Sequence, residues 1–264
     1  MILHPRQSGG LIRQRGVSLV ELMVGVALSL FVLAGIITVY AANRQSFRVL
    51  SDLAEIQEVG RFAVDTIARA VRLAGYQGDS PSEWVLGALS QANGGVDVIS
   101  GANDDASDAN IKDGTDSFTV VYQASSDGLF ADCLGLNTAA AGSNISNTFS
   151  VSPSNALQCS TDGGTTHTTL LENVENMQVL YGVDTDGDQQ ANSYVTANKV
   201  SDWDDVVSLR LALLVRSRND GVALNTDTRA WQLLDKAVYT TLAPANDSRV
   251  RRIFSSTVRL RNRL

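Results

Sequence analysis

The stretch RGVSLVELMVGVALSLFVLAGII, from Arg15 to Ile37, decides the fold of this chain. It is apolar enough to cross a membrane, yet it contains one carboxylate, Glu21. A carboxylate in hydrocarbon costs at least about 2.5 kcal/mol, so it usually marks a function or a partner. The role of Glu21 is therefore the first question to answer.

The apolar run extends beyond this stretch, because no charged residue occurs between Glu21 and Arg44. A helix of about 20 residues covers the roughly 30 Å hydrocarbon core, so residues 22–43 are long enough to span a bilayer. The positive-inside rule assigns a basic flank to the cytoplasm. The basic residues before the run are Arg6, Arg13 and Arg15. We therefore expect a single-pass inner-membrane segment with a periplasmic C-terminal domain.

Two simpler explanations account for only part of this segment. A secretory signal has a shorter apolar core followed by a small-residue cleavage site, and Ala41-Ala42 is a poor candidate for that site. A plain single-pass anchor explains the length and the orientation. Neither explanation accounts for Glu21.

The residues Gly16-Val17-Ser18-Leu19-Val20-Glu21-Leu22 resemble the processing motif of type IV prepilins. The resemblance implies that prepilin peptidase cuts between Gly16 and Val17, which makes residues 1–16 a cytoplasmic leader peptide. It also implies that the same enzyme methylates the new N-terminus. Because Val17 replaces the phenylalanine that is usual in major pilins, methylation of Val17 stays open.

The same resemblance gives Glu21 a role in assembly. Cleavage creates an amine at Val17, close in sequence to Glu21. In a filament, the Glu21 carboxylate of an incoming subunit can pair with the N-terminal amine of its neighbour. An opposite charge nearby offsets the cost of desolvating both groups. An unpaired carboxylate stays unfavourable until the correct partner arrives.

The composition argues against one class of partner. The chain has 264 residues, 21 basic and 28 acidic, for a net charge of −7. The leader holds three arginines and no acid, so the remainder has a net charge of −10. Nonspecific binding to nucleic acid needs a basic surface. We therefore expect no nucleic-acid partner.

The helix is predicted to continue beyond the membrane. From Phe47 to Tyr76, apolar residues recur mostly at three- and four-residue intervals. No proline occurs between Val17 and Tyr76, and Gly75 with Gly78 fits a helix stop. A helix of about 60 residues would be ~90 Å long. Charged residues supply most of the other face: Arg48, Asp52, Glu55, Glu58, Arg61, Asp65, Arg69 and Arg72.

The rest of the chain is predicted to be rich in strands. The segment from Pro81 to about Gly164 is predicted to form long surface loops that one strand interrupts. These loops include a solvated acidic run at Asn103–Asp116. A long helix followed by strands implies an α+β fold, with an antiparallel sheet packed on the amphipathic part of the helix. The predicted strands are Ser117–Gln123, Val174–Val183, Val206–Ser217 and Ile253–Leu260. The predicted parts of the chain are the leader (1–16), the transmembrane or filament-core helix (17–43), its amphipathic continuation (44–78) and the β-rich domain (79–264).

The two cysteines, Cys133 and Cys159, follow the hydrophobic block. No CxxC is present, and His4 with His167 does not complete a zinc-ligand pattern. Outside the cytoplasm a single disulfide is expected, worth roughly 3–4 kcal/mol in the chain-entropy model. Two unpaired buried thiols are the alternative.

The segment DTDGDQQANSYV, from Asp184 to Val195, begins like a calcium loop. The comparison with an EF-hand then fails, because Gln189 replaces the turn glycine and Val195 replaces the bidentate glutamate. A polar hairpin loop is favoured over a calcium site, and no other cofactor is expected. The aspartates that would bind calcium are Asp184, Asp186 and Asp188.

The arginine-rich C-terminus, RVRRIFSSTVRLRNRL, has two explanations. It is either a basic patch for DNA or a closing strand with outward arginines, and its alternating pattern favours the strand. No Ser-His-Asp set, nucleotide loop or metal-hydrolase motif appears, and His167 is the only histidine outside the leader. Acid–base catalysis therefore lacks its commonest agent, and we expect a protein that is not an enzyme.

The segments YGVDTDGD, DWDDVVSLRLALLVRS and RRIFSSTVRLRN resemble the PilW family of type IV pilus minor pilins. The resemblance implies a subunit that joins other minor pilins and the major pilin to prime pilus assembly, with indirect effects on twitching motility and adhesion. The alternative is a J-type minor pseudopilin of type II secretion. A membrane-anchored periplasmic binding or enzymatic domain would instead keep its anchor uncleaved and tolerate Glu21→Ala.

Overall fold

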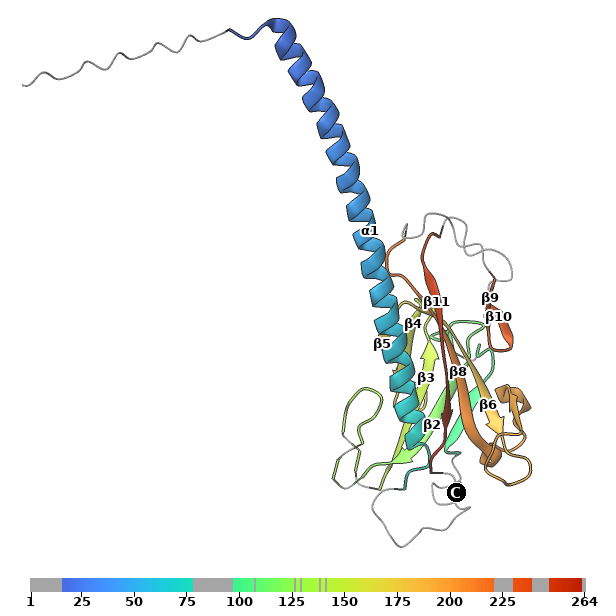
Figure 1. The fold of residues 1–264 in the computed structure, drawn as a ribbon. Coiled ribbons are helices and arrows are strands. Elements are labelled where there is room, and N and C mark those ends of the chain that lie inside the picture. The colour runs from blue at the N-terminus through green and yellow to red at the C-terminus, as the bar shows by residue number, and fades with distance from the viewer. Residues whose placement is uncertain are drawn as a thin grey trace, which may run out of the picture. The chain divides into compact units, whose positions relative to one another are not determined.

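The structure is a computed structural model of the chain, and Figure 1 shows its fold. The leader up to Arg15, Gly78 and Arg263 lie outside the described residues. The chain divides into two units, Met1–Arg48 and Val49–Leu264, which are treated separately below. The described residues are 16–77, 97–106, 108–125, 127–128, 130–137, 139–140, 142–220, 230–238 and 247–262.

Helix α1 runs without a break from Leu19 to Leu73 and has 55 residues. Glu21 lies in its first turn and Arg72 in its last, where each charge interacts favourably with the helix dipole. Within the described residues, this is the one helix long and apolar enough to cross a membrane, with a mean hydropathy of 2.6 in its most apolar window. The predicted continuous helix is confirmed.

The end of α1 follows from one glycine and one distant side chain. Gly75 has a φ of +75°, the left-handed conformation that ends many helices, and this confirms its predicted role as a helix stop. The side-chain amide of Asn262 then donates to the carbonyl oxygens of Arg72, Leu73 and Ala74 at 3.1–3.4 Å. The C-terminal end of the chain therefore caps carbonyl groups that the helix leaves unpaired.

The C-terminal part of α1 buries one face against the β-strands, as its amphipathic pattern predicts. Gly60 packs directly against the ring of Phe254, and the ring leaves no room for a β-carbon at this position. Asp52 contradicts its predicted place on the solvent face, because it is buried and accepts a hydrogen bond from Asn219 at 3.1 Å. A loop residue far along the chain therefore makes this buried carboxylate possible. The buried stripe includes Ile56, Gly60, Ala63, Ile67 and Val71.

Among the described residues, the strands form two larger antiparallel sheets and a hairpin, where the sequence predicted a single sheet. Sheet A has the order β1-β2-β3-β4-β5, and sheet B has the order β11-β8-β6-β7. Sheet A contains β1 (Ile99–Ala102), β2 (Ser117–Gln123), β3 (Asn144–Val151), β4 (Ala156–Ser160) and β5 (Thr168–Glu172). Sheet B contains β6 (Val174–Val183), β7 (Ser193–Val195), β8 (Val206–Arg216) and β11 (Arg251–Arg259).

Three shorter elements complete the described structure. The hairpin consists of β9 (Trp231–Leu233) and β10 (Lys236–Val238), and Leu233 packs on Ala212 and Leu214 of β8. Two single-turn 3₁₀ helices, η2 (Ala197–Lys199) and η3 (Trp203–Asp205), connect β7 to β8. The four predicted strands correspond to β2, β6, β8 and β11, with ends shifted by at most two residues.

The prediction of loops around one strand between Pro81 and Gly164 is wrong. Strands β1, β3 and β4 also lie in this segment, although β3 and β4 contain polar residues that the sequence pattern assigned to loops. These polar side chains are buried with partners: Asn147 donates to the hydroxyl oxygen of Tyr122 at 2.9 Å, and Gln158 donates to Ser150 at 3.0 Å. Tertiary hydrogen bonds therefore replace the apolar pattern that usually identifies a buried strand.

The predicted disulfide between Cys133 and Cys159 is confirmed. It ties the loop after β2 to strand β4, with the two α-carbons 6.4 Å apart. The backbone N–H of Cys133 also donates to the side-chain oxygen of Asn147 at 3.1 Å. The disulfide and this hydrogen bond together hold the loop against sheet A.

Candidate functional site

The predicted cleavage site lies in non-helical backbone before α1. Residues Gly16, Val17 and Ser18 precede the first helical residue, Leu19. No atom lies within 4 Å of the position that a β-carbon of Gly16 would take, and Val17 is 70% exposed. Within the described residues, the peptide bond between Gly16 and Val17 is therefore accessible.

Glu21 differs from the other polar residues of the apolar segment. The hydroxyl of Ser29 donates to the carbonyl of Gly25 at 2.7 Å, and that of Thr38 donates to the carbonyl of Gly35 at 2.8 Å. Both hydroxyls are thus satisfied within their own helix. Glu21 is exposed and has no hydrogen bond or ion pair to any described residue. Any partner for its carboxylate would have to come from outside this part of the chain.

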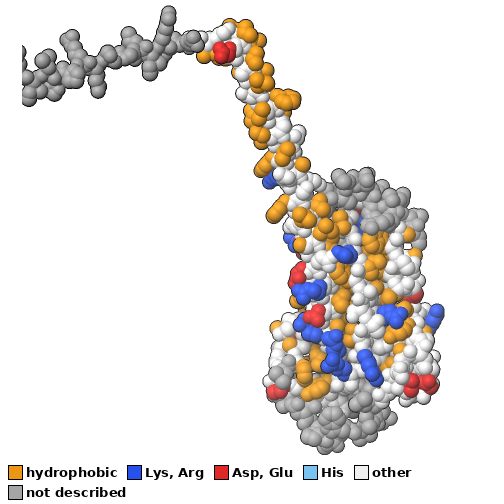
Figure 2. All heavy atoms as spheres, in the orientation of Figure 1, with side chains coloured by type: hydrophobic (Ala, Val, Ile, Leu, Met, Phe, Trp, Pro, Cys, Tyr) orange, Lys and Arg blue, Asp and Glu red, His pale blue; other side chains and the backbone are white. Residues whose placement is uncertain are grey.

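The surface around Glu21 is apolar. Every side chain from Val17 to Arg48 is exposed, and Phe31 reaches 80% exposure. Figure 2 shows hydrophobic side chains along this part of α1. Such a surface is stable only in a membrane or against other apolar surfaces.

The three aspartates of the predicted polar loop lie close together. Side-chain oxygens of Asp184, Asp186 and Asp188 lie within 4.8 Å of one another. The Asp184 carboxylate accepts hydrogen bonds from the backbone N–H groups of Asp186, Gly187 and Gln189 at 2.7–3.2 Å. Desolvation raises the pKa of Asp184, but these hydrogen bonds outweigh it and lower the pKa below its ordinary value. The hydrogen bonds account for the shape of the loop without a cation.

The acidic run Asn103–Asp116 is partly buried, which contradicts its prediction as a solvated loop. Asp116 is 2% exposed, and its two oxygens accept hydrogen bonds from the backbone N–H groups of Asp104 at 2.9 Å and Val179 at 2.8 Å. Its own N–H donates to the carbonyl of Met177 at 2.9 Å. Asp116 thus joins the start of β2 to β6 and connects the two sheets.

Burial raises the pKa of Asp116 to about 7, and the nearby Asp235 and Asp105 add to the effect against the hydrogen bond from Val179. Between pH 4 and 7, the folded protein therefore holds a proton that the unfolded chain has released. The free energy of unfolding should fall as the pH rises through this window, by on the order of 3–4 kcal/mol in total.

Chemical denaturation of the full chain in detergent at several pH values would measure this dependence. The variant Asp116→Asn should lose most of the slope between pH 4 and 7. The control Asp188→Asn, in the exposed loop, should keep it. A free energy of unfolding that rises with pH across this window in the parent chain would contradict the assignment to Asp116.

The prediction that the C-terminal arginines point outward is wrong for Arg251. Its side chain is fully buried and donates to the Glu175 carboxylate at 2.7 and 3.0 Å, and it also pairs with Asp247. Burial alone would lower the pKa of Arg251, but hydrogen bonds and charge interactions with Glu175 and Asp247 raise it above its ordinary value. Arg216 adds a second cation 3.3 Å from Glu175. Arg251 therefore stabilises the packing of sheet B.

Among the described residues, His167 makes one polar side-chain contact. His167 Nε2 lies 2.8 Å from the Asp108 carboxylate, with its side chain 6% exposed. This pair joins the loop before β5 to the acidic run. Neither residue lines the groove that Phe62 and Phe149 help to form.

Two family models match parts of the chain. Residues 141–262 match the family model described as Type IV Pilus-assembly protein W, and residues 11–37 match the Prokaryotic N-terminal methylation motif. A type IV-like pilin from Thermus thermophilus is similar in structure, with a TM-score of 0.44 and 17% sequence identity, over 80% of this chain and 96% of that chain. No curated protein matches the chain.

The N-terminal motif, the long helix with its apolar first part and the antiparallel outer domain define a type IV pilin-like protein. The match of residues 141–262 and the N-terminal motif together support a type IV pilus minor pilin of the PilW family. The predicted family and the predicted α+β class are both confirmed.

Proposed function

We propose that this minor pilin is inserted in the inner membrane, cleaved after Gly16 by prepilin peptidase, and assembled through Glu21. The outer domain would then lie in the periplasm before assembly and on the pilus afterwards. The observation that carries the proposal is the isolated Glu21 carboxylate at the start of an exposed apolar helix. The disulfide supports an oxidising compartment for the outer domain.

In this proposal, the partners are other minor pilins and the major pilin, and the chain helps to prime the filament. Twitching motility and adhesion depend on it indirectly, and the chain has no catalytic role. The match of residues 141–262 favours the pilus over the J-type pseudopilin of type II secretion. Methylation of Val17 would remove no charge from its amine, so pairing with Glu21 remains available in either case.

Intact-mass analysis of the membrane-extracted protein tests the processing step. We expect loss of the mass of residues 1–16 only when prepilin peptidase is present, and an added methyl mass would establish methylation of Val17. The variant Gly16→Val should keep its leader, because a branched side chain replaces the residue next to the scissile bond. The matched control Gly10→Val should be cleaved normally. A full-length mass for the parent chain in both strains would overturn the proposal.

A further inference from the structure

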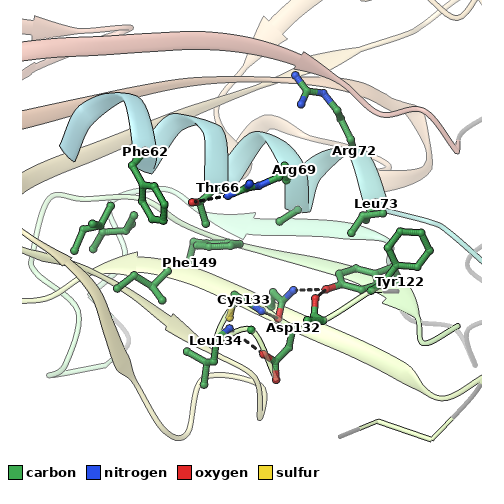
Figure 3. A pocket seen from close by; sticks show the side chains of 18 residues that line it. Phe62, Thr66, Arg69, Arg72, Leu73, Tyr122, Asp132, Cys133, Leu134 and Phe149 are labelled. Carbon is green, nitrogen blue, oxygen red and sulfur yellow. Dashed lines mark hydrogen bonds between the residues drawn. The ribbon is translucent and has the colours of Figure 1, made fainter. Parts of the chain in front are cut away.

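The outer domain contains a groove between α1 and sheet A, with a volume of about 660 Å³. Figure 3 shows Phe62, Thr66 and Leu73 of the helix on one side and Phe149 of β3 on the other. The loop that carries Cys133 and Leu134 also lines the groove, and the disulfide holds this loop in place. The volume lies within the usual range of ligand pockets.

The lining of the groove is mostly apolar and is partly open to solvent. Phe62 points from the helix into the groove and is 47% exposed. Leu170 and Leu171 of β5 line the same groove and are half-buried. Gln158 of β4 pairs with Thr169 and Leu157 pairs with Leu171, so Leu170 is an extra residue in β5. This bulge explains why two consecutive leucines both reach the groove.

Strand β5 also offers unpaired backbone groups at the rim. It is an edge strand of sheet A, and within the described residues its outer edge has no backbone partner. An edge strand presents a row of free N–H and C=O groups to a neighbouring chain. The other long edge strand, β11, carries the exposed arginines Arg252 and Arg259, which protect it. Peptide groups beside an apolar groove favour a peptide as the occupant.

The charge that the groove offers to a ligand is positive. Its charged lining residues are Arg69, Arg72 and Asp132, and the Asp132 carboxylate already accepts the backbone N–H groups of Leu134 and Leu136 at 2.9 Å. Arg69 lies 3.6 Å from Asp65, and both side chains are 60% exposed, so this pair contributes little. The Arg69 guanidinium also donates to the hydroxyl of Thr66 at 3.3 Å, and this exposed contact leaves its other N–H groups available to an incoming carboxylate.

We propose that the groove between α1 and β5 binds a short extended segment of a partner protein, with apolar side chains in the groove and an acidic residue at Arg69. The bulge at Leu170 limits regular strand pairing, so the contact covers a few residues. This surface is separate from Glu21 and goes beyond the assembly role proposed above. Because its test uses purified protein, the result does not depend on processing or on entry into a filament.

The test uses the full chain in lipid nanodiscs and a fluorescently labelled peptide, SLEFELS, which places its apolar residues on one face. We expect saturable binding by fluorescence anisotropy, and at least tenfold weaker binding to Arg69→Glu. The charge-reversed peptide SLKFKLS should bind Arg69→Glu better than it binds the parent chain. The matched control is Arg61→Glu, on the same helix and also in an exposed ion pair, with Glu58. It should change the affinity less than twofold.

A second variant tests the apolar part of the groove. Phe62→Asp should weaken both peptides at least tenfold, and its circular dichroism spectrum should match that of the parent chain. Absence of saturable binding at millimolar peptide would overturn the proposal, as would affinities that Arg69→Glu and Phe62→Asp leave unchanged. Saturable binding of oleate without binding of either peptide would assign the groove to a lipid and would also overturn it.

Discussion

The variant Glu21→Ala should be cleaved and retained in the inner membrane, yet its amount in sheared pili should fall at least tenfold. Glu21 is the one acidic or basic side chain between Val17 and Asn43, and it has no partner among the described residues. Its pairing with the amine of a neighbouring Val17 would offset the cost of placing both charges in an apolar surface. Without the carboxylate, the neighbouring amine stays unpaired. Immunoblots of membrane and sheared-pilus fractions measure the effect.

The matched control for this experiment is Ser29→Ala, in the same apolar segment. The Ser29 hydroxyl is already satisfied by the carbonyl of Gly25, so its removal should leave the pilus fraction nearly unchanged. The variant Glu21→Gln keeps the size of the side chain and removes its charge, and it should behave like Glu21→Ala. Entry of Glu21→Ala into pili at the parental level would show that the carboxylate is not needed for assembly.

Replacing Arg251 by methionine should lower the free energy of unfolding of the outer domain by about 3–5 kcal/mol. The side chain of Arg251 is fully buried, and the two carboxylates that it neutralises are 2% and 8% exposed. Removal of the cation leaves the buried Glu175 and Asp247 with weaker partners, Arg216 at 3.3 Å from Glu175 and Arg249 at 3.6 Å from Asp247. Chemical denaturation of the full chain in detergent, followed by tryptophan fluorescence, measures the loss.

The control for Arg251→Met is Arg252→Met, the same substitution at the next residue of β11, where the side chain is exposed. It should change the free energy of unfolding by less than about 0.5 kcal/mol. A double-mutant cycle with Glu175→Gln isolates the interaction, and we expect a coupling of about 1–3 kcal/mol. Equal losses for Arg251→Met and Arg252→Met would contradict the importance of the buried pair.

The elements with a strong hydrophobic pattern could be predicted from the sequence. Helix α1 follows from an apolar run, an amphipathic run and a glycine stop, all of which are local signals. Strands β6 and β8 follow from continuous or alternating apolar residues. The disulfide followed from the presence of two cysteines in a chain expected outside the cytoplasm. The motif from Gly16 to Leu22 is also local, so the candidate assembly residue was recognisable at once.

The polar parts of the core could not be predicted in this way. Strands β3 and β4 contain Asn147 and Gln158, which are buried because Tyr122 and Ser150 on neighbouring strands accept their hydrogen bonds. The burial of Asp116 at the junction of the sheets is tolerated because the backbone N–H groups of two other segments donate to its oxygens. A buried polar residue needs a partner, and these partners lie on other strands or loops, 8 to 63 residues away along the chain. Local patterns therefore assign such residues to loops.

The sequence by itself determined the long helix, its apolar first part, the cleavage motif with Glu21 and the α+β class, because each of these depends on residues close together in the chain. Only the tertiary structure decided that Arg251 is buried in an ion cluster with Glu175 and Asp247. The tertiary structure also decided the groove beside Phe62, because α1, β5 and the disulfide-bonded loop form it together. Burial of a charge and the shape of a groove depend on which distant segments of the chain pack together. The local sequence pattern does not show which segments these are.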